Sequence, residues 1–208
     1  GPGTDPWLPP PCRIGRPAST VVWVTLSDYR TAVVTGASSG IGAATVEALR
    51  GRGVEVYAVA RRADRLAALA ERTGCVAQVL DVRDTDALTG MLGSLEADVL
   101  VNNAGLGRAA RTLADATTED VDRILSTNVV AAVHAARAVL PGMRDRGRGH
   151  VVNVGSMAGL YPLASSVYGA SKGALHVLSM DLRLELAGTG VRITEICPGR
   201  VRTEFYDV

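Results

Sequence analysis

Short apolar runs alternate with longer amphipathic segments from Tyr29 to the end of the chain. Most of these runs are rich in valine and uninterrupted by polar residues, which is typical of strands buried on both faces of a parallel sheet. The predicted strands are Thr31–Thr35, Val54–Ala60, Val76–Leu80, Val99–Asn102, His150–Val154 and Arg192–Cys197. The predicted helices are Ile41–Arg50, Asp64–Arg72, Asp84–Leu95, Thr118–Arg146 and Ser165–Ala187.

Two of the predicted helices begin with residues that commonly cap helix N-termini, Asp84 in one and Thr117 or Thr118 in the other. Pro141 lies within Thr118–Arg146 and is followed by Gly142. Because proline lacks a backbone N–H and crowds the preceding turn, we expect this pair to disturb the end of that helix.

Strands that alternate with helices predict right-handed βαβ units and a doubly wound parallel sheet. The predicted fold class is therefore α/β in three layers, with about six strands. A chain of 208 residues suits one such domain, which we place at residues 28–208. Residues 1–27 are rich in glycine and proline without periodicity, and we expect a disordered or loosely attached tail there. One hypothesis is that the natural protein begins near Val24.

The composition argues against several classes of function. The formal net charge is +1, which gives no bulk attraction to nucleic acid or to an acidic membrane. No run of about 18 apolar residues is found, so we expect no membrane-spanning segment. The start of the chain lacks the basic-then-apolar order of a signal peptide. We therefore expect a cytoplasmic protein with no membrane or nucleic-acid partner.

The cysteines and histidines show no spacing typical of metal ligands, so no metal site is expected. We expect the cysteines to be small apolar residues in a reducing compartment, and the histidines to be surface or packing residues. These residues are Cys12, Cys75, Cys197, His134, His150 and His176. The arginines between Arg144 and Arg148 lack interleaved aromatic residues, which favours a solvated loop over a nucleic-acid site.

A glycine-rich stretch, TGASSGIG at Thr35–Gly42, joins the first predicted strand to the first predicted helix. Glycine permits positive φ angles and a close approach of another group to the backbone. Free N–H groups at a helix N-terminus then make an anion site suited to a dinucleotide pyrophosphate. The spacing Gly-x-x-x-Gly-x-Gly differs from the common Gly-x-Gly-x-x-Gly fingerprint. A plain tight turn is the alternative interpretation.

Polar and small residues follow three further strands. Arg61 and Arg62 come after the second strand, where arginine suits the 2′-phosphate of NADPH and a carboxylate would suit NADH. We therefore favour NADP(H) over NAD(H), the alternative being two solvated charges. Asp81–Val82 follows the third strand and would contact the adenine. The alternative is that Asp81 is only a carboxylate at the start of the following helix. Asn103, in the stretch Asn102–Gly105, begins a turn that leaves room for a cofactor.

Tyr168 and Lys172 are four residues apart at the start of the last predicted helix, so their side chains share one face. An unperturbed tyrosine titrates near 10. A nearby ammonium and a cationic nicotinamide favour the phenolate and bring this pKa toward the working pH. Ser156, just after the fifth strand, could donate a hydrogen bond to a substrate oxygen.

Taken together, the motifs resemble the short-chain dehydrogenases/reductases of the compact, single-domain type. The similarity rests on TGASSGIG at Thr35–Gly42, Asp81–Val82, NNAG at Asn102–Gly105, Asn128 in STNVV, Ser156 in NVGSMAG, YGASK at Tyr168–Lys172 and PGRVRT at Pro198–Thr203. It spans about Tyr29 to Thr203 in the family's order, and it implies a Rossmann-like sheet.

The resemblance implies roles for these residues. Tyr168 would be the acid/base, Lys172 would lower its pKa and hold the nicotinamide ribose, Ser156 would orient and polarise the carbonyl, and Asn128 would hold a relay water. Pro198–Thr203 would close against the nicotinamide, with Val201 and Thr203 near its carboxamide. The full set of expected cofactor contacts is Gly36, Ser38, Ser39, Gly40, Ile41, Gly42, Arg61, Arg62, Asp81, Val82, Asn103, Ala104, Gly105, Tyr168, Lys172, Pro198, Gly199, Val201 and Thr203.

The expected function is an NADP(H)-dependent oxidoreductase that interconverts a carbonyl compound and a secondary alcohol. Family members usually continue through a substrate lid and a seventh strand, so we expect a domain incomplete at its C-terminus. The alternative function is therefore a non-catalytic dinucleotide-binding fragment or interaction module. Gly155 also stands where the family commonly has a second serine.

Two expectations concern what this site and these helices contact. An apolar substrate pocket would be lined by Leu106, Met157, Leu160 and Tyr161. The helical segments 118–140 and 165–186 carry more apolar residues than one sheet face needs. This surplus favours a homodimer or homotetramer, the alternative being burial within one chain.

Overall fold

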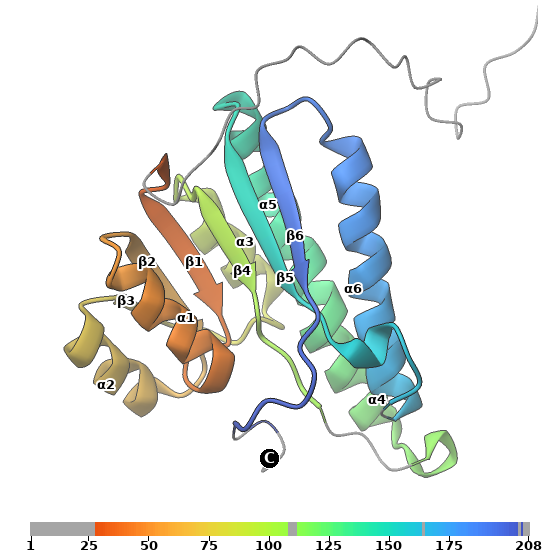
Figure 1. The fold of residues 1–208 in the computed structure, drawn as a ribbon. Coiled ribbons are helices and arrows are strands. Elements are labelled where there is room, and N and C mark those ends of the chain that lie inside the picture. Colours follow the sequence, from red (N-terminus) through yellow and green to blue (C-terminus); the bar gives the residue numbers. More distant parts are fainter. Residues whose placement is uncertain (1–27, 108–111, 164, 204, 206–208) are drawn as a thin grey trace, which may run out of the picture.

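The computed structural model describes residues 28–107, 112–163, 165–203 and 205. Within them a six-stranded parallel sheet has the order β3-β2-β1-β4-β5-β6 (Figure 1). Its strands are β1 (Thr31–Thr35), β2 (Glu55–Ala60), β3 (Val76–Val79), β4 (Val99–Asn102), β5 (Gly149–Val154) and β6 (Val191–Ile196). The predicted tail, the Val24 start and Cys12 lie outside the described residues.

The helices follow the strands in alternation, as the apolar pattern predicts. They are α1 (Gly40–Arg50), α2 (Ala63–Thr73), α3 (Thr85–Gly93), α4 (Thr118–Leu125), α5 (Ala131–Asp145) and α6 (Ser166–Glu185). Shorter turns are η2 (Leu113–Asp115), η3 (Ser126–Val130) and η4 (Met157–Gly159). Both predicted caps are confirmed: the Asp84 side chain accepts from the N–H of Ala87 (3.0 Å), and Thr117 accepts from that of Asp120 (3.1 Å).

Helices cover both faces of the sheet, which confirms the three-layer α/β fold. Side chains of α1 and α2 pack on one face in a core that includes Val34, Val46 and Leu66. Side chains of α3, α5 and α6 pack on the other face, around Leu100 and Val151. The strand order reverses between β1 and β4. The connections that follow these two strands therefore run toward opposite edges of the sheet. The carboxyl ends of β1 and β4 are where doubly wound sheets bind ligands.

The edge strand β3 departs from the expectation of strands buried on both faces. Val79 is 60% exposed and Val76 36% exposed. An edge strand has one hydrogen-bonded neighbour, and helix packing on it is incomplete. β1 and β4, in the middle of the sheet, are buried along almost their whole length, as predicted.

The long helix predicted at Thr118–Arg146 is interrupted at a different place than expected. Pro141 lies inside α5, which continues to Asp145. Pro141 and Arg137, four residues earlier, are both exposed, so water can bind the carbonyl that the proline leaves without a partner. The irregularity is instead the π-turn η3, Ser126–Val130. Such single-turn insertions are frequent at functional sites.

By length and composition the continuous helical stretch Thr118–Asp145 could cross a membrane, which the sequence analysis had excluded. Core helices of soluble proteins pass the same test. Here one side of the stretch, including Ala135, Val139 and Met143, belongs to the buried core against the sheet.

A buried polar chain ties the centre of the sheet to its covering helices. Asn102 of β4 donates through Nδ2 to the Asn153 side chain of β5 (3.0 Å) and to the carbonyl of Ala132 in α5 (3.3 Å). Asn153 donates through its own Nδ2 to Ser179 of α6 (2.8 Å), which donates to the carbonyl of Leu175 (2.7 Å). Each group in this chain is satisfied by the next, so removing one leaves buried partners without hydrogen bonds.

Replacing Asn153 by alanine is expected to lower the free energy of unfolding by about 2 kcal/mol, because Asn102 and Ser179 would lose a buried partner. Urea unfolding followed by circular dichroism measures this change. Gln78→Ala on the edge strand is the matched control and should have a much smaller effect. Equal losses in both variants would contradict the role given to the network.

Candidate active site

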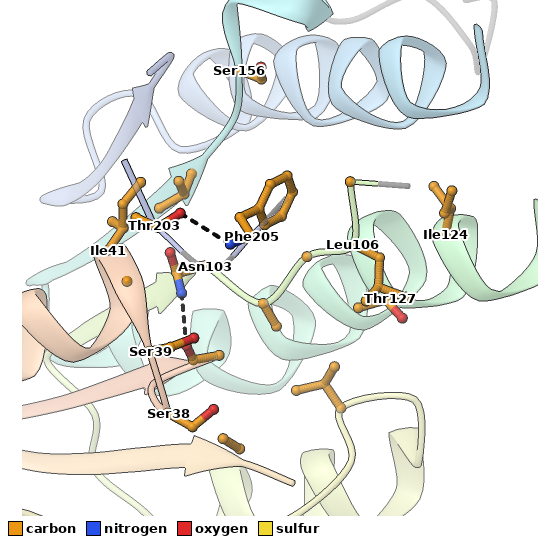
Figure 2. Close-up of a pocket in the computed structure, with 18 of the residues that line it drawn as sticks. Ser38, Ser39, Ile41, Asn103, Leu106, Ile124, Thr127, Ser156, Thr203 and Phe205 are labelled. Carbon is orange, nitrogen blue, oxygen red and sulfur yellow. Dashed lines mark hydrogen bonds between the residues drawn. The ribbon is translucent and has the colours of Figure 1, made fainter. Parts of the chain in front are cut away.

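A cavity of about 470 Å³ opens at the carboxyl edge of the sheet. Its walls come from the glycine-rich loop, the ends of β2 to β5, the start of α6 and the segment after β6 (Figure 2). Most of the residues expected to bind or react with a ligand line it. They are Gly36, Ser38, Ser39, Gly40, Ile41, Arg61, Arg62, Asp81, Val82, Asn103, Ala104, Gly105, Ser156, Tyr168, Lys172, Pro198, Gly199, Val201 and Thr203.

Two expected site residues, Gly42 and Asn128, are not in the cavity wall. A Cβ at Gly42 would overlap the carbonyl oxygen of Gly36, so this glycine lets the loop fold back on the start of α1. Gly36 itself has a positive φ of 65°, and a Cβ on it would lie 2.8 Å from the Cα of Ala104. At these glycines the loop therefore presents bare backbone at the sheet edge.

Thr35, at the end of β1, links the glycine loop to the end of β4 by hydrogen bonds. Its hydroxyl donates to the carbonyl of Val101 (3.2 Å) and accepts from the N–H groups of Asn103 and Ala104 (3.0 Å each). The Asn103 side chain donates to the carbonyls of Thr35 (2.9 Å) and Gly36 (3.2 Å). The sequence analysis gave Thr35 no role. Its position directly before the glycine loop was the available signal.

The two arginines after β2 lie at the cavity in different ways. Arg62 donates to the hydroxyls of Ser38 (2.9 Å from Nη2) and Ser39 (2.7 Å) in the glycine loop. Arg61 is more open, with its side chain 54% exposed and 3.8 Å from the carboxylate of Asp81.

Asp81 is also paired with an arginine that the sequence analysis did not consider. Arg83 contacts the Asp81 carboxylate at 2.7 Å, and this hydrogen bond holds the pKa of Asp81 below its usual value. Asp81 thus brings a compensated charge to the cavity wall.

Lys172 and Tyr168 lie one turn apart on α6, both largely buried at the cavity floor. The Lys172 ammonium donates to the carbonyl of Val154 at the end of β5 (2.7 Å) and lies 6.0 Å from the centroid of the Tyr168 ring. Burial lowers the pKa of Lys172 from 10.5 to about 8. Lys172 is also the only lysine in the chain.

Asn128 sits behind the cavity in the π-turn η3 and is fully buried. Its Oδ1 accepts from the N–H of Leu106 (2.7 Å), and its Nδ2 donates to the carbonyl of Leu106 and to Ser171 (3.0 Å each). A Cβ on Gly105 would lie 3.4 Å from Asn128 Oδ1 and 3.5 Å from Lys172 Nζ. Asn128 and Lys172 therefore converge on the same glycine.

Ser156 follows β5 and lines the cavity, while the residues after it turn away. Its hydroxyl accepts from the N–H of Ala158 (3.1 Å) at the start of η4. Of the expected apolar pocket, only Leu106 lines the cavity. The expectation for Met157, Leu160 and Tyr161 was wrong: the η4 turn packs on α6 and leaves Leu160 and Tyr161 exposed.

Several cavity residues carried no signal in the sequence analysis. Asp120, Arg123, Ile124 and Thr127 come from α4 and η3, where helical periodicity alone does not distinguish a cavity wall from a core face. The ring of Phe205 lies in the cavity, 6.0 Å from the Tyr168 ring (Figure 2). A Cβ on Gly107 would overlap this phenylalanine.

The histidines and cysteines of the described ranges form no group able to hold a metal ion. His150 is hydrogen-bonded to Thr194 (2.8 Å), and His176 to Glu195 (2.7 Å). Cys75 is buried and Cys197 partly buried.

Comparison with known proteins gives a consistent result. The family model for short chain dehydrogenases matches residues 30–207. The NADP-dependent 3-hydroxy acid dehydrogenase YdfG of Escherichia coli is 43% identical over 186 residues, which cover 85% of this chain and 75% of that protein.

Solved structures agree with the sequence comparison. Serine dehydrogenase complexed with NADP⁺ has a TM-score of 0.81 at 40% identity, covering 85% of this chain and 75% of that one. A short-chain dehydrogenase from Sphingobium yanoikuyae in complex with NADPH has a TM-score of 0.81 at 35% identity, covering 86% and 73%. The chain belongs to the short-chain dehydrogenase/reductase family.

Proposed function

We propose that this protein is an NADP(H)-dependent oxidoreductase that transfers hydride between a nicotinamide and a carbonyl compound or secondary alcohol. The observation that carries the proposal is the shared cavity. The cavity is lined by the glycine-rich loop, by an arginine pair, and by Ser156, Tyr168 and Lys172. Binding and acid–base chemistry can therefore take place on one ligand.

The residues present fit a dinucleotide with a 2′-phosphate. The close approach of Gly42 to Gly36 leaves backbone N–H groups at the start of α1, suited to a pyrophosphate. Arg61 and Arg62 follow β2, where a 2′-phosphate is recognised, and the Asp81 carboxylate is compensated by Arg83. The chain accordingly favours NADP(H) over NAD(H), in agreement with the NADP-dependent relative and the NADP⁺ and NADPH complexes.

When bound, the nicotinamide supplies or accepts the hydride. Tyr168 gives a proton to the carbonyl oxygen in reduction and removes one from the hydroxyl in oxidation. The Lys172 ammonium favours the ionised phenol and binds the nicotinamide ribose. Ser156 donates a hydrogen bond to the substrate oxygen and so orients it.

Asn128 is proposed to hold the water that links Lys172 to solvent. Its Nδ2 hydrogens are used by Leu106 and Ser171, and its Oδ1 accepts one hydrogen bond, from the N–H of Leu106. A second lone pair on Oδ1 can therefore accept from a water. Asn128 lies in the π-turn η3, where the helix is wider and the backbone hydrogen bonds span five residues in place of four.

The remaining proposals concern the cellular location and the oligomeric state of the protein. The protein acts in the cytoplasm on a small molecule and pairs with further copies of itself as a homodimer or homotetramer. Support comes from apolar side chains left exposed on neighbouring helices. They are Val130 at the end of η3, Val133 in the first turn of α5, and Val177, Met180 and Leu184 on α6.

The alternative is a binding module without turnover. Tyr168, Lys172 and Ser156 share one cavity, and Asn128 lies directly behind it, which favours the enzyme. An oxidation assay with NADP⁺, read out as NADPH formation, separates the two functions. The compounds to test are 3-hydroxy acids and serine, which are named for the relatives, and apolar secondary alcohols. NADPH binding without turnover of any compound would favour the module.

Tyr168→Phe is expected to lower kcat by roughly 10²–10⁴-fold, because it removes the proton donor and acceptor. Binding of NADPH, measured by its fluorescence, should change little. Tyr161→Phe removes a hydroxyl from an exposed tyrosine outside the cavity and serves as the control. Unchanged turnover in Tyr168→Phe would contradict the assignment.

Arg61→Ala is expected to weaken NADPH binding by roughly tenfold or more while NADH binding changes little, because only NADPH carries the 2′-phosphate. Fluorescence titration with both nucleotides measures the difference. Arg72→Ala on α2, whose arginine pairs with Glu47 outside the cavity, is the matched control. Equal losses for the two nucleotides would make Arg61 a surface charge only.

Sedimentation velocity of the purified protein is expected to give the mass of a dimer or tetramer. Met180→Glu would place a charge in the exposed apolar row and should shift the population toward monomer. A monomer at all protein concentrations would contradict the proposed assembly.

A further inference from the structure

A buried carboxylate packs against Gly155, the residue that follows the Val154 anchor of the Lys172 ammonium. Glu195 is on β6, and its side chain is 5% exposed. Its Oε2 is 2.7 Å from Nδ1 of His176. His176 follows Lys172 by four residues on α6, so the histidine that holds the carboxylate shares a helix face with the lysine.

Gly155 provides the space that this carboxylate occupies. A Cβ at Gly155 would overlap Oε1 of Glu195, so any other residue would displace the charge. Among the described residues Oε1 has no hydrogen-bond partner. Gly155 directly follows Val154, whose carbonyl binds the Lys172 ammonium. The glycine thus places the carboxylate beside the anchor of the ammonium.

The buried ammonium needs such a charge. The titratable groups around Lys172 are Tyr168 and His176 on its own helix, Glu195 on β6, and Cys197 just after β6. Burial lowers the pKa of Lys172, whereas Glu195 first and Cys197 second raise it again. Burial raises the pKa of the Cys197 thiol, which keeps that group uncharged near neutral pH. Glu195 is then the carboxylate that opposes the cost of burying the cation.

We propose that Glu195 is a positioning residue of this site: its carboxylate, held by His176 and fitted against Gly155, keeps Lys172 in its ammonium form. The inference deepens the proposed function, since it explains how the buried lysine stays charged while it acts on Tyr168. Glu195 does not line the cavity and acts through the lysine.

The single lysine makes the test direct. Protein labelled with carbon-13 at the lysine ε position gives one side-chain resonance, and its shift reports protonation. In the free wild-type protein the midpoint should lie near pH 8. Glu195→Gln removes the charge but keeps the shape, and should lower the midpoint by roughly half a pH unit or more. Asp181→Asn removes an exposed charge from the same helix and should leave it unchanged.

A second variant tests the fit to Gly155. Gly155→Ala places a methyl group where Oε1 lies and should also lower the midpoint, with no further shift when combined with Glu195→Gln. An unchanged midpoint in Glu195→Gln overturns the inference. If Glu195→Gln does not fold, an unchanged midpoint in Gly155→Ala overturns it.

The outcome is independent of turnover because the titration uses neither nucleotide nor substrate. A shifted midpoint in a protein without oxidoreductase activity would refute the proposed function alone. If Tyr168→Phe loses activity as expected but the midpoint in Glu195→Gln does not shift, only the role of Glu195 is refuted.

Discussion

The burial of one ammonium group constrains the whole catalytic edge of this protein. Lys172 is 3% exposed, and its hydrogen bond to Val154 fixes the start of α6 against the end of β5. A cation in this position is costly unless its surroundings compensate. The Val154 carbonyl and the Glu195 carboxylate supply that compensation, and they come from two neighbouring strands, β5 and β6.

The sheet places these parts together because of its topology. Between β1 and β4 the connections run to opposite sides, which leaves space at the carboxyl ends for a ligand. The glycine loop closes this space on one side and α6 closes it on the other. Buried hydrogen bonds from Thr35 and Asn103 fix the loop, and the Asn102–Asn153–Ser179 chain fixes the sheet to α6. Both sides of the site are therefore attached to the same rigid centre.

Where the sequence analysis was wrong, the physical reason is tertiary. Pro141 was expected to disturb the end of its helix, but it lies on an exposed face of α5, where the carbonyl left without a partner is open to solvent. Met157, Leu160 and Tyr161 were expected in the cavity because they follow Ser156, yet η4 turns them onto α6 and into solvent. In each case the direction of a side chain depends on what packs beside it, and neighbouring positions in the sequence do not reveal that.

The alternation of valine-rich runs with amphipathic segments was enough to determine the α/β class and the six strands, because burial on two faces leaves a continuous apolar run. The glycine loop, Tyr168 with Lys172, and Ser156 were also recognisable, since their chemistry depends on short spacings within one turn or loop. The contribution of Thr35, the cavity walls from α4, the ring of Phe205 and the pairing of Gly155 with Glu195 depended on the tertiary structure. These contacts join residues far apart in the chain, and only the packing of β6 and α6 beside β5 brings Glu195 to the lysine.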